Sequence, residues 1–230
     1  MLERATLDEL LADAEQAHGH LCAGQVLGVR MAMLALERLG LVDPRRRWLP
    51  DGSLNPERKR LVTFVEIDRC ATDAIAVVTG CRVGKRALKL RDWGKMAATF
   101  VDLDAALEDS IYKGLRIVAR ESSKARASQL YPALEKNLQQ MTAYREMPAE
   151  ELFAEQWVRV ELAPSEFPGY KGQRVTCAEC GEGIHFNRFR LQHGRTLCRS
   201  CAEPGERYYA PIEVQQQSEA PPAEPQDALR

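Results

Sequence analysis

The chain has no long hydrophobic run and no excess of charge of either sign. Its 230 residues include 32 Lys or Arg and 33 Asp or Glu, which gives a formal net charge of −1. No overall field therefore attracts nucleic acid or an anionic membrane. No stretch approaches the roughly 18 apolar residues of a membrane-spanning helix, and the first residues mix acids among leucines, unlike a signal peptide. We therefore expect a cytoplasmic protein with no membrane partner, and nucleic acid is disfavoured.

The number of cysteines in the chain is odd. The chain has seven, and a reducing cytosol argues against a disulfide framework. Four of them form two Cys-x-x-Cys pairs, which predict a structural Zn²⁺ site made by Cys177, Cys180, Cys198 and Cys201. Gly181 permits the tight turn that such a pair needs. The alternative, two redox motifs, requires a strand-helix context that this loop-rich stretch lacks.

The role of this finger is less well defined by its composition. Residues 171–210 contain seven Lys or Arg and four Glu, a modest basic excess. Phe186 and Phe189 are candidates for stacking on bases, but a small domain also needs them as its core. His185 and His193 are alternative ligands, although four cysteines already complete a tetrahedral shell. A structural or protein-docking finger is favoured over nucleic-acid readout.

The periodicity of the chain predicts an α+β core domain over residues 1–162. A linker over 163–176, a finger over 177–210 and a disordered tail over 211–230 follow. Strands are expected at 61–67, 87–91, 97–101 and 157–162, the second and third on either side of a turn at 92–95. Helices are expected at 7–18, 25–39, 70–79, 104–122 and 132–145.

Several helix boundaries have specific signals. Thr6 and Glu9 form a capping box, Asp68 is a candidate cap, and Pro132 takes a favoured first position. The helix at 25–39 is apolar almost all round, which predicts a buried central helix. The apolar helices expected between 104 and 145 are candidate elements of a homodimer interface, although core packing explains their pattern equally well.

A second group of potential metal ligands lies in the first third of the chain. His18, His20 and Cys22 precede the apolar helix, and Cys70 lies where another helix begins. A helix N-terminus favours the thiolate form of such cysteines. These four residues are candidates for a second Zn²⁺ or other metal, with Cys22 and Cys70 the candidate catalytic residues. The competing interpretation is that the cysteines are small buried hydrophobes and the histidines pack or cap.

Asp68, Asp73 and Cys81, which accompany these candidates, also have a purely structural explanation. Asp68 and Asp73 are candidates to orient a ligand, but helix capping explains them equally well. Cys81 follows a helix-ending glycine and is explained by core packing.

Four motifs in order resemble the FmdE family, proteins related to the FmdE component of formylmethanofuran dehydrogenase. They are His-Gly-His-Leu-Cys-Ala-Gly (18–24), Glu-Ile-Asp-Arg-Cys-Ala-Thr-Asp-Ala-Ile (66–75), Thr-Gly-Cys-Arg-Val-Gly-Lys (79–85) and Asp-Trp-Gly-Lys (92–95). The resemblance implies a thioredoxin-like mixed β-sheet flanked by helices, followed by a treble-clef finger. It also implies a metal site at His18, His20, Cys22 and Cys70, with Cys81 and Lys85 nearby.

The chain departs from the family pattern at two positions. Ala23 stands where the family usually has Pro, and Ile67 where it often has Asn. Neither is a candidate ligand, but Ile67 removes a polar group that would help to orient one.

The resemblance favours a metal-binding accessory protein linked to molybdenum- or tungsten-dependent formylmethanofuran or formate metabolism. Its N-terminal site would bind metal or carry sulfur, and a molybdenum or tungsten enzyme is the expected partner. The alternative is a regulatory module that binds nucleic acid or protein through the finger. A third hypothesis, catalysis by a zinc-activated water, needs a general base, for which Glu66 and Asp68 are the candidates.

Overall fold

The computed structural model describes residues 3–210, and the chain divides into two compact units, Met1–Lys171 and Gly172–Arg230. The first is an α+β domain and the second contains the four-cysteine finger. The tail predicted over 211–230 lies outside the described residues, and the other predicted domain bounds stay predictions. No helix within residues 3–210 is long and apolar enough to cross a membrane.

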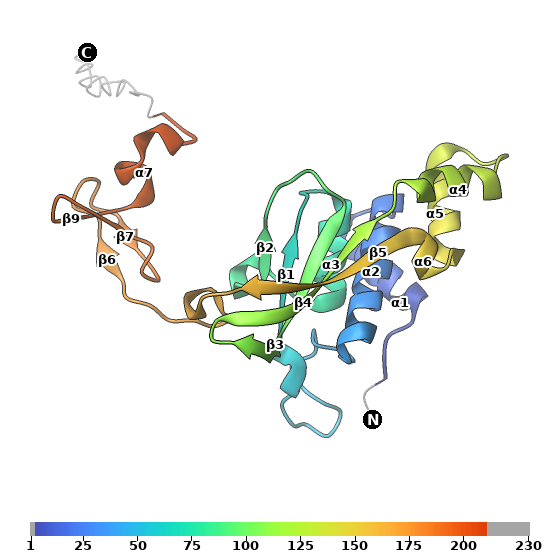
Figure 1. Cartoon of the computed structure of the whole chain (residues 1–230), viewed down its shortest axis with the longest axis horizontal. Coiled ribbons are helices and arrows are strands. Elements are labelled where there is room, and N and C mark those ends of the chain that lie inside the picture. Colours follow the sequence, from blue (N-terminus) through green and yellow to red (C-terminus); the bar gives the residue numbers. More distant parts are fainter. Residues whose placement is uncertain (1–2, 211–230) are drawn as a thin grey trace, which may run out of the picture. The chain divides into compact units, whose positions relative to one another are not determined.

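A five-stranded mixed sheet forms the centre of the first unit, with strand order β2-β1-β3-β4-β5 (Figure 1). β1 and β2 run parallel, and the other neighbouring strands are antiparallel. The strands are Leu61–Val65 (β1), Leu88–Leu90 (β2), Ala97–Glu108 (β3), Ile111–Ala119 (β4) and Phe153–Glu161 (β5). The predicted α+β class with a mixed sheet is confirmed.

Helices pack on one face of this sheet. They are Leu7–His18 (α1), Ala23–Leu39 (α2), Cys70–Thr79 (α3), Ser122–Leu130 (α4), Lys136–Glu146 (α5) and Ala149–Leu152 (α6). Side chains of α2 such as Val26 and Met31 are fully buried in one core with Phe100 and Leu115 of the sheet. The prediction of a buried central helix is therefore confirmed. The opposite face carries a smaller apolar cluster centred on Val62, Val101 and Leu162.

Local signals determine the ends of the first helices as expected. Thr6 and Glu9 form the predicted capping box at the start of α1. Gly40 ends α2 and Gly80 ends α3, each in the left-handed conformation with φ of 69°.

The helix predicted over 104–122 is wrong. Residues 97–119 form the β3–β4 hairpin, whose turn places Ser110 at φ of 61°. Leu115 and Ile117 alternate with exposed or half-exposed residues and point into the core, which is the pattern of a strand. The proposed dimer helices between 104 and 145 therefore lose their first part to the sheet, and a homodimer stays a prediction.

The following helices differ from the prediction in their starts. α5 begins at Lys136 behind a Glu135 cap, so Pro132 does not occupy its first position. α4 forms over Ser122–Leu130, partly in a stretch predicted as a connection. Asp68 is not a helix cap either, because Arg69 precedes α3 and no side chain caps it.

β2 and β3 flank the 92–95 turn as expected but do not pair with each other, since each borders β1 on a different side.

The second unit consists of short elements. Two hairpins, Val175–Thr176 with Gly183–Ile184 (β6, β7) and Arg190–Gln192 with Arg195–Leu197 (β8, β9), precede the short helix Arg199–Ala202 (α7). Its core contains only three buried residues among those described, Cys177, Ile184 and Leu197. So small a core needs a further crosslink to stay folded. The treble-clef arrangement of this unit and the thioredoxin-like layout of the first stay predictions.

Helices α2 and α3 pack closely where they cross. A methyl group added at Gly28 of α2 would lie 2.5 Å from the carbonyl oxygen of Ala71 and 2.8 Å from its Cα. Gly24, one turn earlier, lies beside Cys70, with 3.4 Å between an added Cβ and the Cβ of Cys70. The two glycines share one face of α2, and together they let the first turn of α3 pack directly against it.

We predict that Gly28→Ala lowers the free energy of unfolding of the first unit by about 3 kcal/mol, because the new methyl group meets backbone that cannot rotate away. Urea unfolding followed by tryptophan fluorescence measures this, since Trp48, Trp93 and Trp157 all lie in the first unit. The matched control is Gly84→Ala, where an added Cβ meets no atom within 4 Å. Equal stability of the two variants would contradict the close packing.

Candidate functional site

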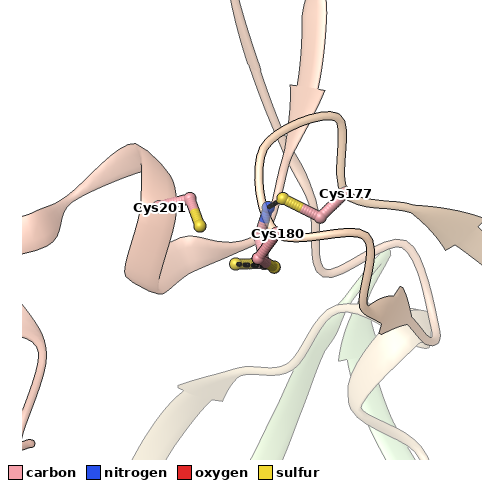
Figure 2. Close-up of side chains that lie close together, drawn as sticks. Cys177, Cys180 and Cys201 are labelled. Carbon is pink, nitrogen blue, oxygen red and sulfur yellow. Dashed lines mark hydrogen bonds between the residues drawn. The ribbon is translucent and has the colours of Figure 1, made fainter. Parts of the chain in front are cut away.

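The four finger cysteines come from two turns that face each other. Cys177 and Cys180 flank the turn after β6, where Gly181 adopts φ of 74°. Cys198 immediately precedes α7, and Cys201 lies within it. Figure 2 shows the side chains of Cys177, Cys180 and Cys201 gathered around one point between the two turns.

The sulfur positions suit a tetrahedral metal. All four sulfur atoms lie within 4.8 Å of one another, and the Cys180 and Cys198 sulfurs are 3.9 Å apart. A tetrahedral zinc with bonds of about 2.3 Å to sulfur requires edges of about 3.8 Å. The donor set and its spacing therefore fit a structural Zn²⁺.

The thiols of this cluster cannot all ionise together without a cation. Backbone hydrogen bonds from Cys180 and Cys198 lower the pKa of Cys177 to about 6, and the Ser200 hydroxyl lowers the pKa of Cys198. The neighbouring Cys198 thiol raises the pKa of Cys201 to about 12. A divalent cation offsets the mutual repulsion and draws off the remaining protons, so zinc binding and deprotonation are coupled.

At the other end of the chain, two helix starts converge on a pair of thiols. Cys22 is the residue before α2, and Cys70 is the first residue of α3. A Cβ placed on Gly24 would lie 3.8 Å from the Cys22 sulfur and 3.4 Å from the Cβ of Cys70. Both side chains are half-buried, and the Cys22 thiol does not cap its own helix. Its side chain instead interacts with the Cys70 thiol.

The pKa of Cys70 differs from what a helix start alone would give. Burial and the neighbouring Cys22 thiol raise the pKa of Cys70 above its ordinary value. The metal-free protein therefore keeps Cys70 as a thiol at neutral pH, contrary to the expected thiolate. A positive charge between the two sulfurs would reverse this balance.

The two histidines lie together beside α3. His18 ends α1, and its Nδ1 is 2.8 Å from an Asp73 carboxylate oxygen in the first turn of α3. The rings of His18 and His20 are 4.9 Å apart. A carboxylate that holds one ring nitrogen fixes the ring and leaves Nε2 free, which is how metal-ligating histidines are oriented. The structure thus places Cys22 beside Cys70 and, separately, His18 beside His20. Both pairs lie next to the first turn of α3.

The grouping of the N-terminal candidates is looser than that of the finger. Among the described residues, the finger cysteines form the one group of three or more His, Cys, Asp or Glu whose ligand atoms are mutually close. The metal site predicted at His18, His20, Cys22 and Cys70 therefore stays a prediction.

Other candidates from the sequence lie elsewhere or have other partners. Cys81 is buried in the core, with its sulfur 3.4 Å from the Thr63 hydroxyl oxygen, and it follows the far end of α3. The ten residues of α3 span about 15 Å and separate Cys81 from the Cys70 end, and Lys85 follows in the short 3₁₀ helix Val83–Lys85. Glu66 is buried and accepts two hydrogen bonds of 2.7 Å from Arg116, so it is not a free general base.

The features that sequence reasoning misses concern geometry. The sequence leaves Asp73 ambiguous between cap and orienting group, and its contact with His18 favours the second. The roles of Gly24 and Gly28 depend on which helix packs against them. The 92–95 turn is held at the end of β1, because the amides of Trp93 and Lys95 donate to the Glu66 carbonyl oxygen. It therefore borders the segment that leads to Cys70.

We predict that Cys180→Ser removes one zinc per chain and unfolds the finger while the first unit stays folded, because the finger core is too small to fold without metal. Zinc content by mass spectrometry and limited proteolysis, with cleavage expected between residues 172 and 210, measure both effects. The control is His193→Asn, a neighbouring donor outside the cluster, which keeps its zinc. Full zinc in the Cys180 variant would contradict the four-sulfur site.

Comparison with known proteins agrees with this division into two parts. Residues 17–162 match the family described as FmdE, molybdenum formylmethanofuran dehydrogenase operon. Residues 170–207 match the prokaryotic dksA/traR C4-type zinc finger. The first match contains all four N-terminal candidates, and the second contains all four finger cysteines.

The proteins that resemble the chain include a curated relative and a solved structure. A probable S-adenosyl-L-methionine-binding protein of Archaeoglobus fulgidus is 30% identical over an alignment of 233 positions, which covers 91% of this chain and 56% of that protein. The chain thus spans about half the length of this relative. The crystal structure of a tungsten formylmethanofuran dehydrogenase FmdE-like protein from Syntrophus aciditrophicus has a TM-score of 0.53 and 20% identity, covering 90% of this chain and 100% of that one. At this identity the likeness concerns the fold. Because the family match covers more than half of the residues, the chain belongs to the FmdE family, with a C-terminal four-cysteine zinc finger.

Proposed function

We propose that this protein is a metal-binding accessory protein of molybdenum- or tungsten-dependent formylmethanofuran or formate metabolism. Its N-terminal site binds the metal through Cys22, Cys70 and the His18–His20 pair, and its finger holds a structural zinc. The observation that supports this most directly is the convergence of two half-buried thiols at the starts of α2 and α3.

The chemistry of these residues supports a site distinct in kind from the finger. Two thiolates and an imidazole form a set that zinc accepts with one position left open. His18 is oriented by Asp73, and the N-terminal partial charges of α2 and α3 favour negative sulfur. A metal held there would supply a Lewis-acidic centre that a small ligand can reach, since the four side chains are exposed or half-exposed.

The link to molybdenum or tungsten metabolism derives from the description of the family and of the Syntrophus protein. The genes beside the one that encodes this chain test it. Neighbouring genes for molybdoenzyme components or for synthesis of their cofactor would support the link, and their absence would favour a different pathway.

The alternative, a regulatory module that binds nucleic acid through the finger, has less support. Several finger arginines are already paired with glutamate: Arg190 with Glu203, Arg195 with Glu179, and Arg199 with Glu203 and Glu206. These pairs reduce the basic charge that a phosphate backbone would meet.

We predict that the full-length wild-type protein binds two equivalents of zinc and that the double variant Cys22→Ala, Cys70→Ser binds one. The finger zinc serves as an internal standard, because the substitutions leave its four cysteines intact. Metal content by mass spectrometry after zinc loading and gel filtration gives the ratio. One equivalent in the wild type, or two in the variant, would refute the N-terminal site.

A second variant tests the orienting role of Asp73. We expect Asp73→Asn to weaken binding at the N-terminal site about 10- to 100-fold, because the imidazole loses the carboxylate that fixes it. Competition with a chromophoric zinc chelator measures this affinity, with the finger site unchanged. Asp68→Asn is the matched control, since Asp68 is also exposed and close in sequence but has no contact with His18. Equal affinities in the two variants would show that Asp73 has no role in the site.

A further inference from the structure

A cavity of about 460 Å³ lies at the end of α3 opposite Cys70. Such a volume falls within the range of small-molecule sites. α1, the loop after α2, the end of α3 and the short 3₁₀ helix Val83–Lys85 all contribute to its wall. The lining residues are Asp13, Ala17, Arg45, Arg46, Val77, Gly80, Arg82 and Lys85.

The lining is strongly cationic. Four of its side chains carry positive charge and one, Asp13, carries negative charge. The chain as a whole has a net charge of −1, so the concentration of positive charge is local. Closely spaced cations in a concave surface focus the field and attract a multiply charged anion.

Two of the cations are held in place by carboxylates. Arg45 donates to Asp13 at 2.7 Å and to Asp43 at 3.0 Å, and Arg46 donates to Asp43 at 2.9 Å. The Asp43 side chain is only 4% exposed, and it uses one oxygen for each arginine. Each guanidinium has five donors, so both keep N–H groups that these carboxylates do not use.

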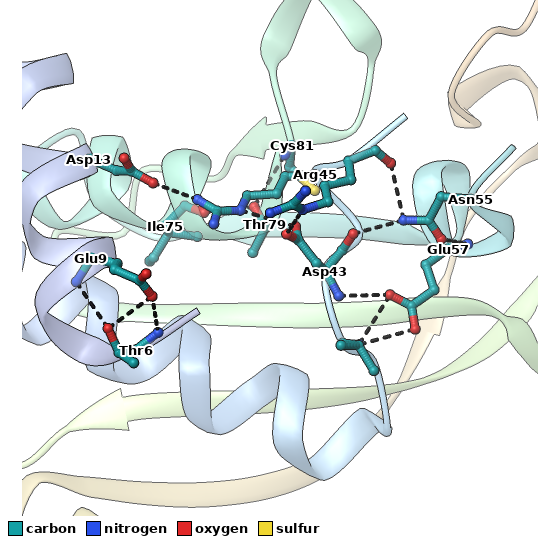
Figure 3. Close-up of polar contacts among 12 residues, drawn as sticks. Thr6, Glu9, Asp13, Asp43, Arg45, Asn55, Glu57, Ile75, Thr79 and Cys81 are labelled. Carbon is teal, nitrogen blue, oxygen red and sulfur yellow. Dashed lines mark hydrogen bonds and ion pairs between the residues drawn. The ribbon is translucent and has the colours of Figure 1, made fainter. Parts of the chain in front are cut away.

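The loop that carries these arginines is itself fixed, as Figure 3 shows. The Glu57 carboxylate accepts hydrogen bonds from the backbone amides of Val42 and Asp43. The Asn55 side chain donates to the carbonyl oxygens of Asp43 and Arg46. An added Cβ at Gly80 would lie 2.6 Å from the Cα of Arg45, so only glycine allows the loop to pack on the end of α3.

The other two positively charged side chains have no carboxylate partner among residues 3–210. Within residues 3–210, neither Arg82 nor Lys85 forms an ion pair, and both side chains are exposed. The C-terminal partial charge of α3 opposes an anion here. One of its last four carbonyls is already satisfied, however, because the Gly80 N–H donates to the Ala76 carbonyl oxygen. The full positive charges therefore dominate the cavity.

We propose that this cavity binds a small molecule that carries a diphosphate group. The arginine pair fixed by Asp43 faces one phosphate and the pair of Arg82 and Lys85 faces the other, since guanidinium groups and ammonium groups both bind phosphate oxygens. A single phosphate engages one pair and leaves most of the cavity unfilled. Ala17 and Val77 offer apolar surface for the rest of the molecule.

Calorimetric titration of the full-length, zinc-loaded protein with pyrophosphate at constant ionic strength tests this. We expect saturable binding of one pyrophosphate per chain, tighter than that of inorganic phosphate. The double variant Arg82→Gln, Lys85→Gln should weaken it roughly tenfold or more, because two charged hydrogen bonds are lost. Both side chains are exposed, so the fold is retained, and a thermal melt verifies this.

Two controls make the result specific. Lys136→Gln removes an exposed positive charge on α5, away from the cavity lining, and should leave pyrophosphate affinity unchanged. The Cys22→Ala, Cys70→Ser variant should also bind normally, so this proposal and the metal site fail or succeed separately. Absence of saturable binding, equal affinity for phosphate and pyrophosphate, or equal losses in the Lys136 and Arg82–Lys85 variants would overturn the proposal.

Discussion

The packing of α2 against α3 is the contact on which the N-terminal site depends. At Gly28 the two helices approach until backbone meets backbone, with 2.5 Å between an added Cβ and the Ala71 carbonyl oxygen. Because Gly24 lies one turn earlier on the same face, the starts of both helices also meet. Cys22 and Cys70, which are far apart in the sequence, become neighbours through this contact. Asp73, in the same first turn of α3, then reaches His18.

Buried ion pairs position the loops around this helix pair. Glu66 follows β1 directly, and the two hydrogen bonds that it accepts from Arg116 tie the end of β1 to β4, two strands away in the sheet. Its carbonyl oxygen also accepts the amides of the 92–95 turn. Breaking such a pair leaves an uncompensated buried charge, which typically costs about 3–5 kcal/mol. Glu66 is therefore explained by the architecture, although its place in a motif makes it a candidate base.

Sequence reasoning predicts what short-range chemistry controls. The capping box of Thr6 and Glu9 and the terminal glycines of α2 and α3 are local signals, and all of them determine the observed ends. The strand at 97–101 is predicted, but its continuation through 104–119 escapes such reasoning because the stretch after Asp104 contains good helix formers such as Ala and Leu. Pairing of β3 with β4, and of β4 with β5, overrides that propensity. The finger cysteines are close in sequence as pairs, whereas the grouping of Cys22 with Cys70 requires a tertiary contact between helices.

The two ends of α3 have different chemistry because a helix is polar. Its N-terminal end carries a partial positive charge and lies beside the side chains of Cys22 and Cys70. Its C-terminal end has the opposite polarity, and cations gather there: Arg45, Arg46, Arg82 and Lys85. About 15 Å of helix separates the two ends, so a metal at one and an anion at the other would not compete for the same groups.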